Sequence, residues 1–400
     1  MYIKEAQPKI IKNSRKELTI EISIKTLKGK FNASAPSGKS KGKYENPAYN
    51  SRGIYWSQKI LEEFCQKLKD RNFMIKNFSE LENFEKIIKD FESRLGEFGA
   101  NCTYALETAF LKAVAKENKK ELWEFLLSEK NLKIPMPVGN CIGGGLHSHS
   151  DEKPDFQEFL LIPIEEDFSK AISKNIEAYR KAEALIKKKE KKWNIKTNDE
   201  TALQSELSNE ETLQILKEVA DEFGLKIGID AASSSFFHNN LYNYKNKRLA
   251  RKRNEQIDYM KKLIQDFDIF YVEDPMEEED FSGFAKLSSL IGEKSLIVGD
   301  DLTVTNLERL KKAVKRKSIN AMIIKPNQNG SILETAKVID YCKKNGIKTI
   351  FSHRSGETMD DALADYAIGF GVDFVKCGVL GKERLVKMGR IIEIEKSLKI

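Results

Sequence analysis

The sequence contains no apolar run long enough to cross a membrane. Its apolar runs are far shorter than the roughly 18 residues that a transmembrane helix needs. The first residues, MYIKEAQPKIIKNSR, also lack the apolar segment of a secretory signal. These two absences predict a cytoplasmic protein without a membrane span. With 40% hydrophobic residues, the chain can still build a sizeable core.

Cysteine is scarce and scattered along the chain. The five cysteines include no CxxC pair, which argues against a disulfide framework and against a cysteine zinc site. Cys377 adjoins Lys376, but we interpret it as a small buried apolar residue. We therefore expect reduced thiols at Cys65, Cys102, Cys141, Cys342 and Cys377.

The charge balance is basic but shows no nucleic-acid pattern. The net charge is +7 in a chain with 32% charged residues. The basic residues do not gather with aromatic side chains into a platform for stacking bases, so we expect no nucleic-acid partner. The densest basic run, residues 187–192, lies at the C-terminal end of an expected helix. Cations there interact favourably with the helix dipole, so we interpret the run as a solvated helix end.

Residues 1–130 differ in pattern from the rest. LTIEISIKT alternates apolar and polar residues, Lys28-Gly29-Lys30 suggests a hairpin turn, and FNAS continues as a strand. The polar, glycine-flanked segment Pro36–Gly42 reads as a loop. Apolar spacing between residues 55 and 127 favours helices. Strands followed by helices predict a smaller α+β domain over 1–130.

From residue 131 to 400, strands and helices alternate. PMPVGNCI and Phe159–Ile164 are two expected strands, and six more apolar runs follow between Leu225 and Gly378. A helix is expected over 209–223, with Ser208 and Glu211 forming a capping box. Eight strands alternating with helices predict an α/β fold of the TIM-like barrel type, a catalytic domain over 131–400.

The six later strands end in ionisable residues. In a parallel barrel the active site lies at the carboxyl ends of the strands. Asp230, Glu273 and Asp300 end three successive strands, and carboxylate oxygens suit Mg²⁺. We interpret the neighbours Asp274 and Asp301 as solvated loop or capping residues. The sequence thus predicts a metal site facing an anionic substrate.

Basic residues end the next three strands. Lys325 follows a run of isoleucines, so burial and nearby cations are expected to lower its pKa and suit it to act as a general base. His353, Arg354 and Ser355 bring a guanidinium and a hydroxyl that match phosphate. Lys376 adds a second cation for an anionic or hydroxyl group.

Strings along nearly the whole chain resemble the enolases, the glycolytic dehydratases of 2-phosphoglycerate. VGDDLTVTN and FSHRSGET are the most specific, and IGIDAASSSFF, YVEDPM, IIKPNQNGS and VKCGVLGKERLVKMGRIIEIE join them. Upstream, NSRKELTIEI resembles the family's first strand and APSGKSKG its PSGxSxG loop. GGGLH and QEFLLIP resemble its GGxH and QEF elements. All occur in the family's order, so the chain is identified as a divergent member of the enolase family.

The resemblance implies a fold, a reaction and a set of site residues. It implies an enolase-type barrel whose second strand is antiparallel, a homodimer or larger homo-oligomer, and a lyase of glycolysis and gluconeogenesis. The reaction is the reversible dehydration of 2-phospho-D-glycerate to phosphoenolpyruvate with Mg²⁺, in two ions, one conformational and one catalytic. Lys325 matches the base that takes the C2 proton, and Glu200 matches the acid for the departing C3 hydroxyl, with Glu158 and His353 also in the catalytic set. The remaining matches are metal ligands (Asp230, Glu273, Asp300, Ser40) and substrate contacts (His147, Gln157, Glu158, Lys325, Arg354, Ser355, Lys376).

The chain departs from the family pattern in four places, one of which is a lengthened segment between His147 and Glu158. Enolases usually carry GDEGG at the acid, but Thr201 and Ala202 follow Glu200 here, which removes the easy access of glycine to positive φ. Lys16-Glu17-Leu18 replaces Gly-Asn-Pro, and lysines flank Ser40.

These departures leave alternatives open. His149 competes with His147, which we prefer because it follows the glycines at the family's spacing. The protein can also be a divergent superfamily enzyme that acts on another carboxylate, or a non-catalytic enolase-like binding protein.

Overall fold

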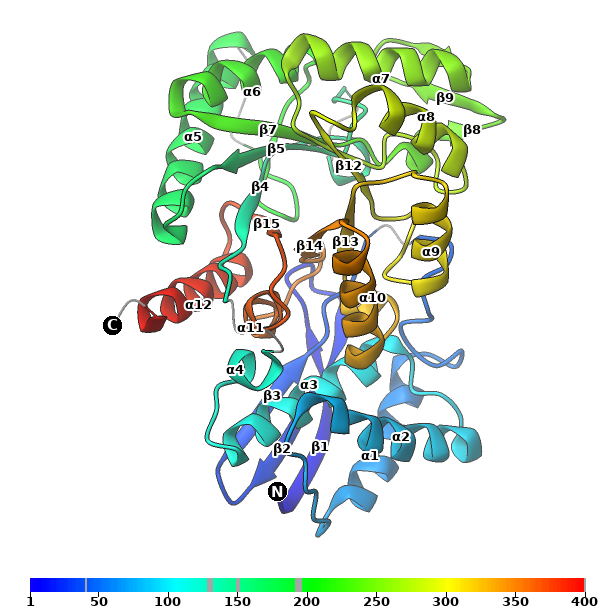
Figure 1. The fold of residues 1–400 in the computed structure, drawn as a ribbon, viewed down its shortest axis with the longest axis vertical. Coiled ribbons are helices and arrows are strands. Elements are labelled where there is room, and N and C mark those ends of the chain that lie inside the picture. Colours follow the sequence, from blue (N-terminus) through cyan, green and yellow to red (C-terminus); the bar gives the residue numbers. More distant parts are fainter. Residues whose placement is uncertain (40–41, 128–131, 149–151, 191–195, 399–400) are drawn as a thin grey trace.

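The computed structural model describes residues 1–39, 42–127, 132–148, 152–190 and 196–398. A barrel and an N-terminal group of strands and helices lie at opposite ends of the view in Figure 1. None of the described helices combines the length and apolarity needed to cross a membrane.

The N-terminal part begins with an antiparallel sheet in the order β1-β2-β3. The alternation in β2 buries Ile20, Ile22 and Ile24 completely, since side chains of one strand point to opposite faces. The sequence pattern did not predict the first strand, β1, because polar residues and Pro8 interrupt its alternation. The strands are β1 (Ile3–Lys12), β2 (Leu18–Thr26) and β3 (Lys30–Ser34).

Helices cover this sheet, as expected. Helix α3 packs on β2 and β3, and α1 packs on β1. A core of phenylalanines joins them, with Phe84 stacked on Phe110 at a ring distance of 3.7 Å. The elements are α1 (Ile54–Leu68), η1 (Phe78–Glu80), α2 (Leu81–Leu95), α3 (Ala100–Glu117) and α4 (Leu122–Leu126).

Eight strands close into a barrel, which confirms the expected fold class. The ring runs β4-β5-β7-β11-β12-β13-β14-β15, and β15 pairs with β4 to close it. The second strand, β5, is antiparallel to both neighbours, whereas the other pairs are parallel. The strands are β4 (Met136–Gly143), β5 (Glu158–Pro163), β7 (Leu225–Asp230), β11 (Tyr271–Glu273), β12 (Leu296–Gly299), β13 (Ala321–Ile324), β14 (Lys348–Ser352) and β15 (Phe374–Gly378).

Apolar side chains fill the barrel, and helices surround it. Val138, Leu160, Val298, Ile323 and Ile350 meet in the interior. Ser208 and Glu211 form the expected capping box of α6. The outer helices are α5 (Phe168–Lys189), α6 (Asn209–Phe223), α7 (Arg253–Phe267), α8 (Phe281–Ile291), α9 (Leu307–Lys315), α10 (Ile332–Lys344), α11 (Ala362–Gly369) and α12 (Lys382–Leu398).

Four short strands lie outside the ring and were not anticipated from the sequence. One pairs with β4, and three form a separate small sheet. Their brevity leaves too few residues for a recognisable alternation. They are β6 (Leu203–Gln204), β8 (Phe237–His238), β9 (Leu241–Tyr244) and β10 (Leu249–Arg251).

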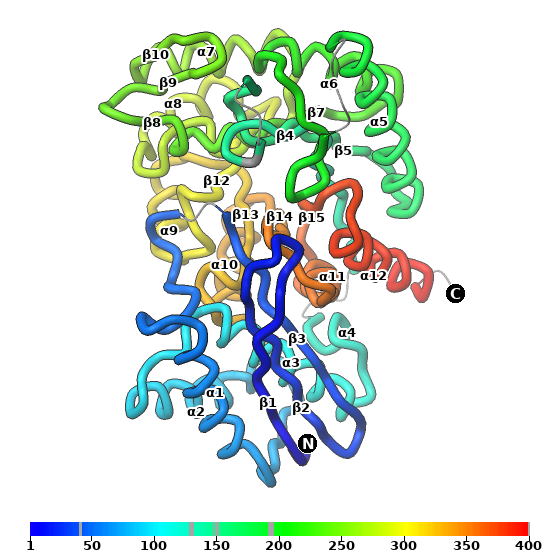
Figure 2. Tube along the Cα trace, turned by 180° about the vertical axis from the view of Figure 1, so that it is seen from behind, coloured from blue at the N-terminus to red at the C-terminus, as the bar shows by residue number. Residues whose placement is uncertain are grey.

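The N-terminal part reaches the mouth of the barrel. Figure 2 shows the N-terminal sheet extending to the barrel near β14. Ser37 and Gly356 form a β-bridge there, and the Ser14 amide donates to the carbonyl of Glu357 at 2.8 Å. The mouth is therefore lined by strand ends on one side and by the N-terminal segment after β3 on the other.

Candidate active site

A small polar pocket lies at the mouth of the barrel. It combines strand-end residues with residues of the segment after β3 and of the turn before β6. Its walls carry both signs of charge, so it suits a charged ligand. The lining residues are Gly38, Lys39, Glu45, Gln157, Glu158, Glu200, Asp230, Asp300, Asp301, Lys325, Ser352, His353, Arg354, Ser355 and Lys376.

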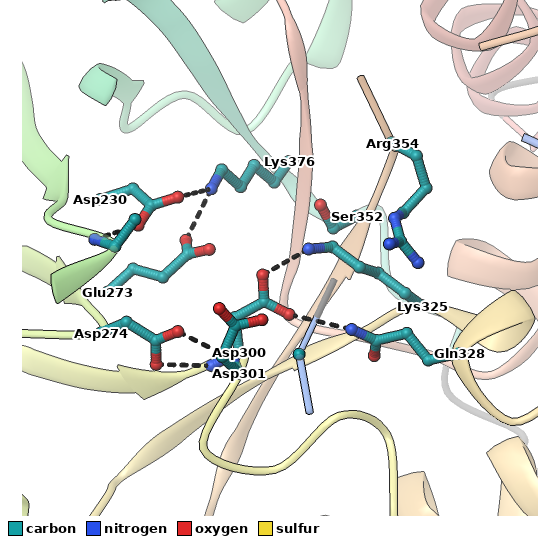
Figure 3. Close-up of polar contacts among 12 residues, drawn as sticks. Asp230, Glu273, Asp274, Asp300, Asp301, Lys325, Gln328, Ser352, Arg354 and Lys376 are labelled. Atoms are coloured by element: carbon teal, nitrogen blue, oxygen red, sulfur yellow. Dashed lines mark hydrogen bonds and ion pairs between the residues drawn. The ribbon is translucent and has the colours of Figure 1, made fainter. Parts of the chain in front are cut away.

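Lys376 lies among three carboxylates from three other strands. Its Nζ is 2.7 Å from Glu158 Oε2, 2.7 Å from Glu273 Oε2 and 3.2 Å from Asp230 Oδ2, and Figure 3 shows it between Asp230 and Glu273. Antiparallel β5 places Glu158 directly opposite Asp230 on β7. The expected meeting of residues from different strands therefore occurs, and all four side chains are buried.

Burial and mutual repulsion shift the titration of this cluster. Burial, followed by the nearby Asp230 carboxylate, raises the pKa of Glu273 to about 8 against the opposing effect of Lys376. Burial disfavours the charge of Lys376, but Asp230, Glu158 and Glu273 outweigh it and raise the lysine pKa well above its usual value. Lys376 is thus a fixed cation in a group of acids.

Lys325 follows β13 and forms an ion pair with Asp300, which follows β12. The second oxygen of Asp300 accepts a hydrogen bond from Gln328 Nε2 at 3.3 Å (Figure 3). Burial lowers the pKa of Lys325, as expected, but Asp300 outweighs burial and raises it above the usual value. The predicted lowering was wrong because the sequence does not show that a carboxylate lies against the ammonium group.

Asp274 and Asp301 are not the solvated loop residues that we expected. Asp274 is buried, and its two oxygens accept the amide hydrogens of Asp300 at 3.0 Å and Asp301 at 2.8 Å. Asp301 is half-buried and lines the pocket. Oxygens of Asp274, Asp300 and Asp301 lie within 4.8 Å of one another. Since Asp274 holds the backbone of the other two, it shapes the turn that presents Asp300.

The strand-end carboxylates fit a divalent cation. Glu273 is fully buried, and its Oε1 has no hydrogen-bond partner among the residues that the structure describes. An unsatisfied buried carboxylate oxygen is costly unless a cation or donor meets it. Together with Asp230 and Asp300 it offers only oxygen ligands, the donor type that Mg²⁺ prefers.

Glu200 faces into the same pocket from an irregular turn. Its Oε2 accepts a hydrogen bond from Asn140 Nδ2 at 3.1 Å and lies 3.5 Å from His353 Nε2. Asn198 Oδ1 shapes the turn by accepting the amide hydrogens of Glu200 at 2.9 Å and Ala202 at 3.0 Å. The turn keeps a positive φ of 64° at Thr201, although no glycine is present. The departure from the family pattern therefore does not turn the glutamate away.

Arg354 is already engaged by a carboxylate in this structure. Its Nη2 lies 3.0 Å from Glu45 Oε1, and Nη1 donates to Asn327 Oδ1 at 3.2 Å. Ser355 Oγ accepts the amide hydrogen of Lys39 at 2.8 Å. No sequence pattern pointed to Glu45, because it lies in an irregular segment outside every charged strand end.

Gln157 and the two candidate histidines complete the set. Gln157 Nε2 donates to Asp230 Oδ2 at 3.4 Å, beside the lysine cluster. His147 ends the 3₁₀ turn η2 (Gly145–His147), next to the glycine run, and its side chain is not described. Ser40 and His149 lie outside the described residues.

Comparisons with known proteins match the chain over nearly its full length. The family model "Enolase, N-terminal domain" matches residues 3–126, and "Enolase, C-terminal TIM barrel domain" matches residues 131–399. The chain is 34% identical to a protein named Enolase from Methanothermobacter thermautotrophicus, over 99% of this chain and 97% of that one. It is 36% identical to a protein of the same name from Thermoplasma acidophilum, over 99% and 98% of the two chains.

Proposed function

Because the chain belongs to the enolase family, we propose that it catalyses the reversible, Mg²⁺-dependent dehydration of 2-phospho-D-glycerate to phosphoenolpyruvate. Membership confirms the resemblance seen in the sequence and the expected enzyme class, a hydro-lyase. The observation that most supports this reaction is that Lys325 and Glu200 line one pocket together with Asp230 and Asp300. A base and an acid beside carboxylates that fit a metal are the groups such a dehydration needs.

The first step is removal of the C2 proton of the substrate. Lys325 is the proposed base, and in the deprotonated form its Nζ accepts this proton as negative charge spreads into the carboxylate. Enolase-superfamily sites use a Lys or His base with one or two Mg²⁺ ions. Asp230, Glu273 and Asp300 would hold Mg²⁺, with Ser40 at a second ion, and the metal would supply positive charge where negative charge develops on the substrate.

The second step is loss of the C3 hydroxyl. Glu200 is the proposed acid: it donates a proton to the hydroxyl oxygen as the C3–O bond breaks and the C2–C3 double bond forms, releasing water. The amide group of Asn140 and the imidazole of His353 lie against the Glu200 carboxylate, and Glu158 Oε2 lies 2.7 Å from Lys376 Nζ. These neighbours orient the acid and keep it inside the pocket.

Anion recognition is assigned to the remaining residues of the mouth. The guanidinium of Arg354 and the hydroxyl of Ser355 suit the phosphate group, because a planar fork of N–H donors matches phosphate oxygens. Lys376, a buried cation, is proposed to contact a carboxylate or hydroxyl group of the substrate. Gln157 and His147 are proposed as further substrate contacts.

A direct assay tests the proposal and separates it from the alternatives. We expect phosphoenolpyruvate to form from 2-phosphoglycerate with Mg²⁺ and not with EDTA. Glu273→Gln should abolish the activity, whereas Glu293→Gln, an exposed glutamate after α8, should leave it unchanged. No phosphoenolpyruvate but turnover of another acid, tested on a panel of acid sugars, would favour a divergent superfamily enzyme.

A second measurement addresses the binding-protein alternative. A non-catalytic enolase-like protein would show no turnover, and its function would survive Lys325→Ala. We also propose a homo-oligomer and a cytoplasmic location, which the resemblance to the family suggests. Sedimentation of the purified protein tests the first, and cell fractionation tests the second.

A further inference from the structure

The turn that carries Glu200 adopts an unusual backbone conformation. Thr201 has a φ of +64°, and a β-branched residue in this region is a genuine outlier. Such conformations persist only when the surrounding structure holds them. The contacts of Thr201 therefore decide whether the turn keeps its shape.

One hydroxyl group connects this turn to the end of the barrel. Thr201 Oγ1 lies 2.6 Å from the carbonyl oxygen of Glu200 and 2.6 Å from that of Leu380. The single hydroxyl hydrogen is shared between them. Leu380 lies just after β15, the strand that carries Lys376, so the bridge ties the acid turn to the loop that follows the buried lysine.

The turn at Glu200 and the loop after β15 pack closely against each other. A Cβ on Gly381 would lie 3.1 Å from Thr201 Cγ2, and one on Gly378 would lie 2.9 Å from the Glu200 carbonyl oxygen. Tyr179 also donates its hydroxyl hydrogen to the Thr201 carbonyl at 2.7 Å. The acid turn is thus held from two sides, by α5 and by the loop after β15.

We propose that Thr201 is a positioning residue for the acid Glu200. Its hydroxyl bridge fixes the strained turn on the loop after β15 and so holds the Glu200 carboxylate against Asn140 in the pocket. The inference rests on the proposed function, in which Glu200 protonates the leaving hydroxyl. A shift of the acid by about 1 Å can reduce a rate by about 100-fold.

Three substitutions separate the hydroxyl from the backbone conformation. Thr201→Val keeps the branched shape and removes the bridge, Thr201→Ser keeps the hydroxyl, and Thr201→Gly removes both the bridge and the strain. We expect kcat to fall about 10- to 100-fold in the valine variant with KM changed less than about threefold. The serine variant should retain most of the wild-type kcat, and the glycine variant should lose kcat without losing stability.

Hydrogen exchange at C2 identifies which step is affected. In D₂O, base removal of the C2 proton exchanges that hydrogen even when the hydroxyl fails to leave. The ratio of exchange to dehydration should therefore rise at least tenfold in Thr201→Val, as in Glu200→Gln. Thr335→Val is the matched control, because its hydroxyl also bonds a backbone carbonyl, that of Ser331 at 2.8 Å, on a helix outside the pocket. It should leave kcat and the ratio unchanged.

The outcomes distinguish the inference from the proposed function. Unchanged kcat and an unchanged ratio in Thr201→Val would overturn the inference, and so would an equal loss of exchange and dehydration, which indicates a merely structural role. If the wild-type protein fails to dehydrate 2-phosphoglycerate, the proposed function fails. A crystal structure of the serine and valine variants then decides the inference, by whether Glu200 keeps its 3.1 Å contact with Asn140 only when the hydroxyl is present.

Discussion

Lys376 and Glu200 face one pocket, but the chain holds them in different ways. Lys376 lies inside β15, paired in register with Val138 and Ser352 on the neighbouring strands, and meets acids from three other strands. Glu200 lies on an irregular turn that depends on single side chains: Asn198 Oδ1 accepts the Glu200 amide hydrogen, and the Thr201 hydroxyl donates to the Leu380 carbonyl. Strand-end residues therefore move only if the barrel changes, whereas one lost hydroxyl can displace the acid.

This difference predicts that substitutions at the strand ends act mainly by removing a charge and leave the backbone in place. Lys325→Met should keep the shape of the stem, remove the base and reduce kcat by about 10⁴-fold, the upper end for loss of a general base. It should also abolish C2 hydrogen exchange, unlike Glu200→Gln. Lys311→Met, an exposed lysine on α9, is the control. Exchange that survives in Lys325→Met would assign the base to another residue.

Removing the second lysine should affect stability first. Lys376→Met would leave Glu158, Asp230 and Glu273 without their buried cation, at a cost of about 3–5 kcal/mol. Mg²⁺ should recover more stability in this variant than in the wild type, because it binds the folded site and Lys376 no longer competes with it for the three carboxylates. Urea denaturation with Mg²⁺ and with EDTA measures both effects. Equal stabilisation of the two proteins would place the metal away from this cluster.

The placement of charged residues at the strand ends was predictable from the sequence because it follows from periodicity. Apolar runs that end in Asp230, Glu273 and Lys325 show both where a strand ends and what it presents. The antiparallel direction of β5 came only from the family resemblance, as did every assignment to the turn at Glu200. Nothing periodic marks an irregular turn.

The features that could not be predicted from the sequence depend on contacts between segments that are distant along the chain. The raised pKa of Lys325 requires Asp300 beside it, and the burial of Asp274 follows from two amide hydrogens that it accepts. Glu45 reaches Arg354 across the interface between the N-terminal segment and the barrel. Residue types alone do not show such distances.

In the turn after β14, the Glu357 side chain makes both a hydrogen bond to the backbone of the turn and an ion pair with another element. Glu357 accepts the Arg354 amide hydrogen at 3.0 Å and pairs with Lys387 of α12 at 2.8 Å, both side chains being buried. Burial alone would raise the pKa of Glu357, but Lys387, followed by His353 and Arg384, lowers it below its usual 4.5. A lowered carboxyl pKa stabilises the fold above the unfolded pKa, and this stability is lost as the pH falls through the folded value.

Glu357→Gln should therefore destabilise the protein in a pH-dependent manner. The expected loss is about 3 kcal/mol at pH 7, because Lys387 remains buried without its carboxylate. The difference from the wild type should shrink as the pH falls below the usual glutamate range and through the lowered folded pKa of Glu357, where this carboxylate becomes protonated in the wild type as well. Urea denaturation across this range measures it. Glu334→Gln, in an exposed ion pair on α10, is the control and should show a much smaller loss of stability. A stability difference between Glu357→Gln and the wild type that stays constant with pH would contradict the role assigned to the Glu357 charge.

The smallest expected effect is a change in stability at two turns, each of which has a residue with positive φ. Lys16, like Thr201, stands where the family pattern has glycine and keeps a positive φ, of 62°. Its side chain is exposed, whereas Thr201 bridges two carbonyls. Lys16→Gly should therefore stabilise the protein by about 1 kcal/mol, the usual cost of the left-handed conformation for a residue with a side chain. Thr201→Gly should stabilise the protein by less, because the relief of backbone strain is offset by the loss of the hydroxyl bridge. Thermal denaturation of the two variants measures this difference, and an equal gain at both positions would show that the Thr201 hydroxyl contributes nothing to holding its turn.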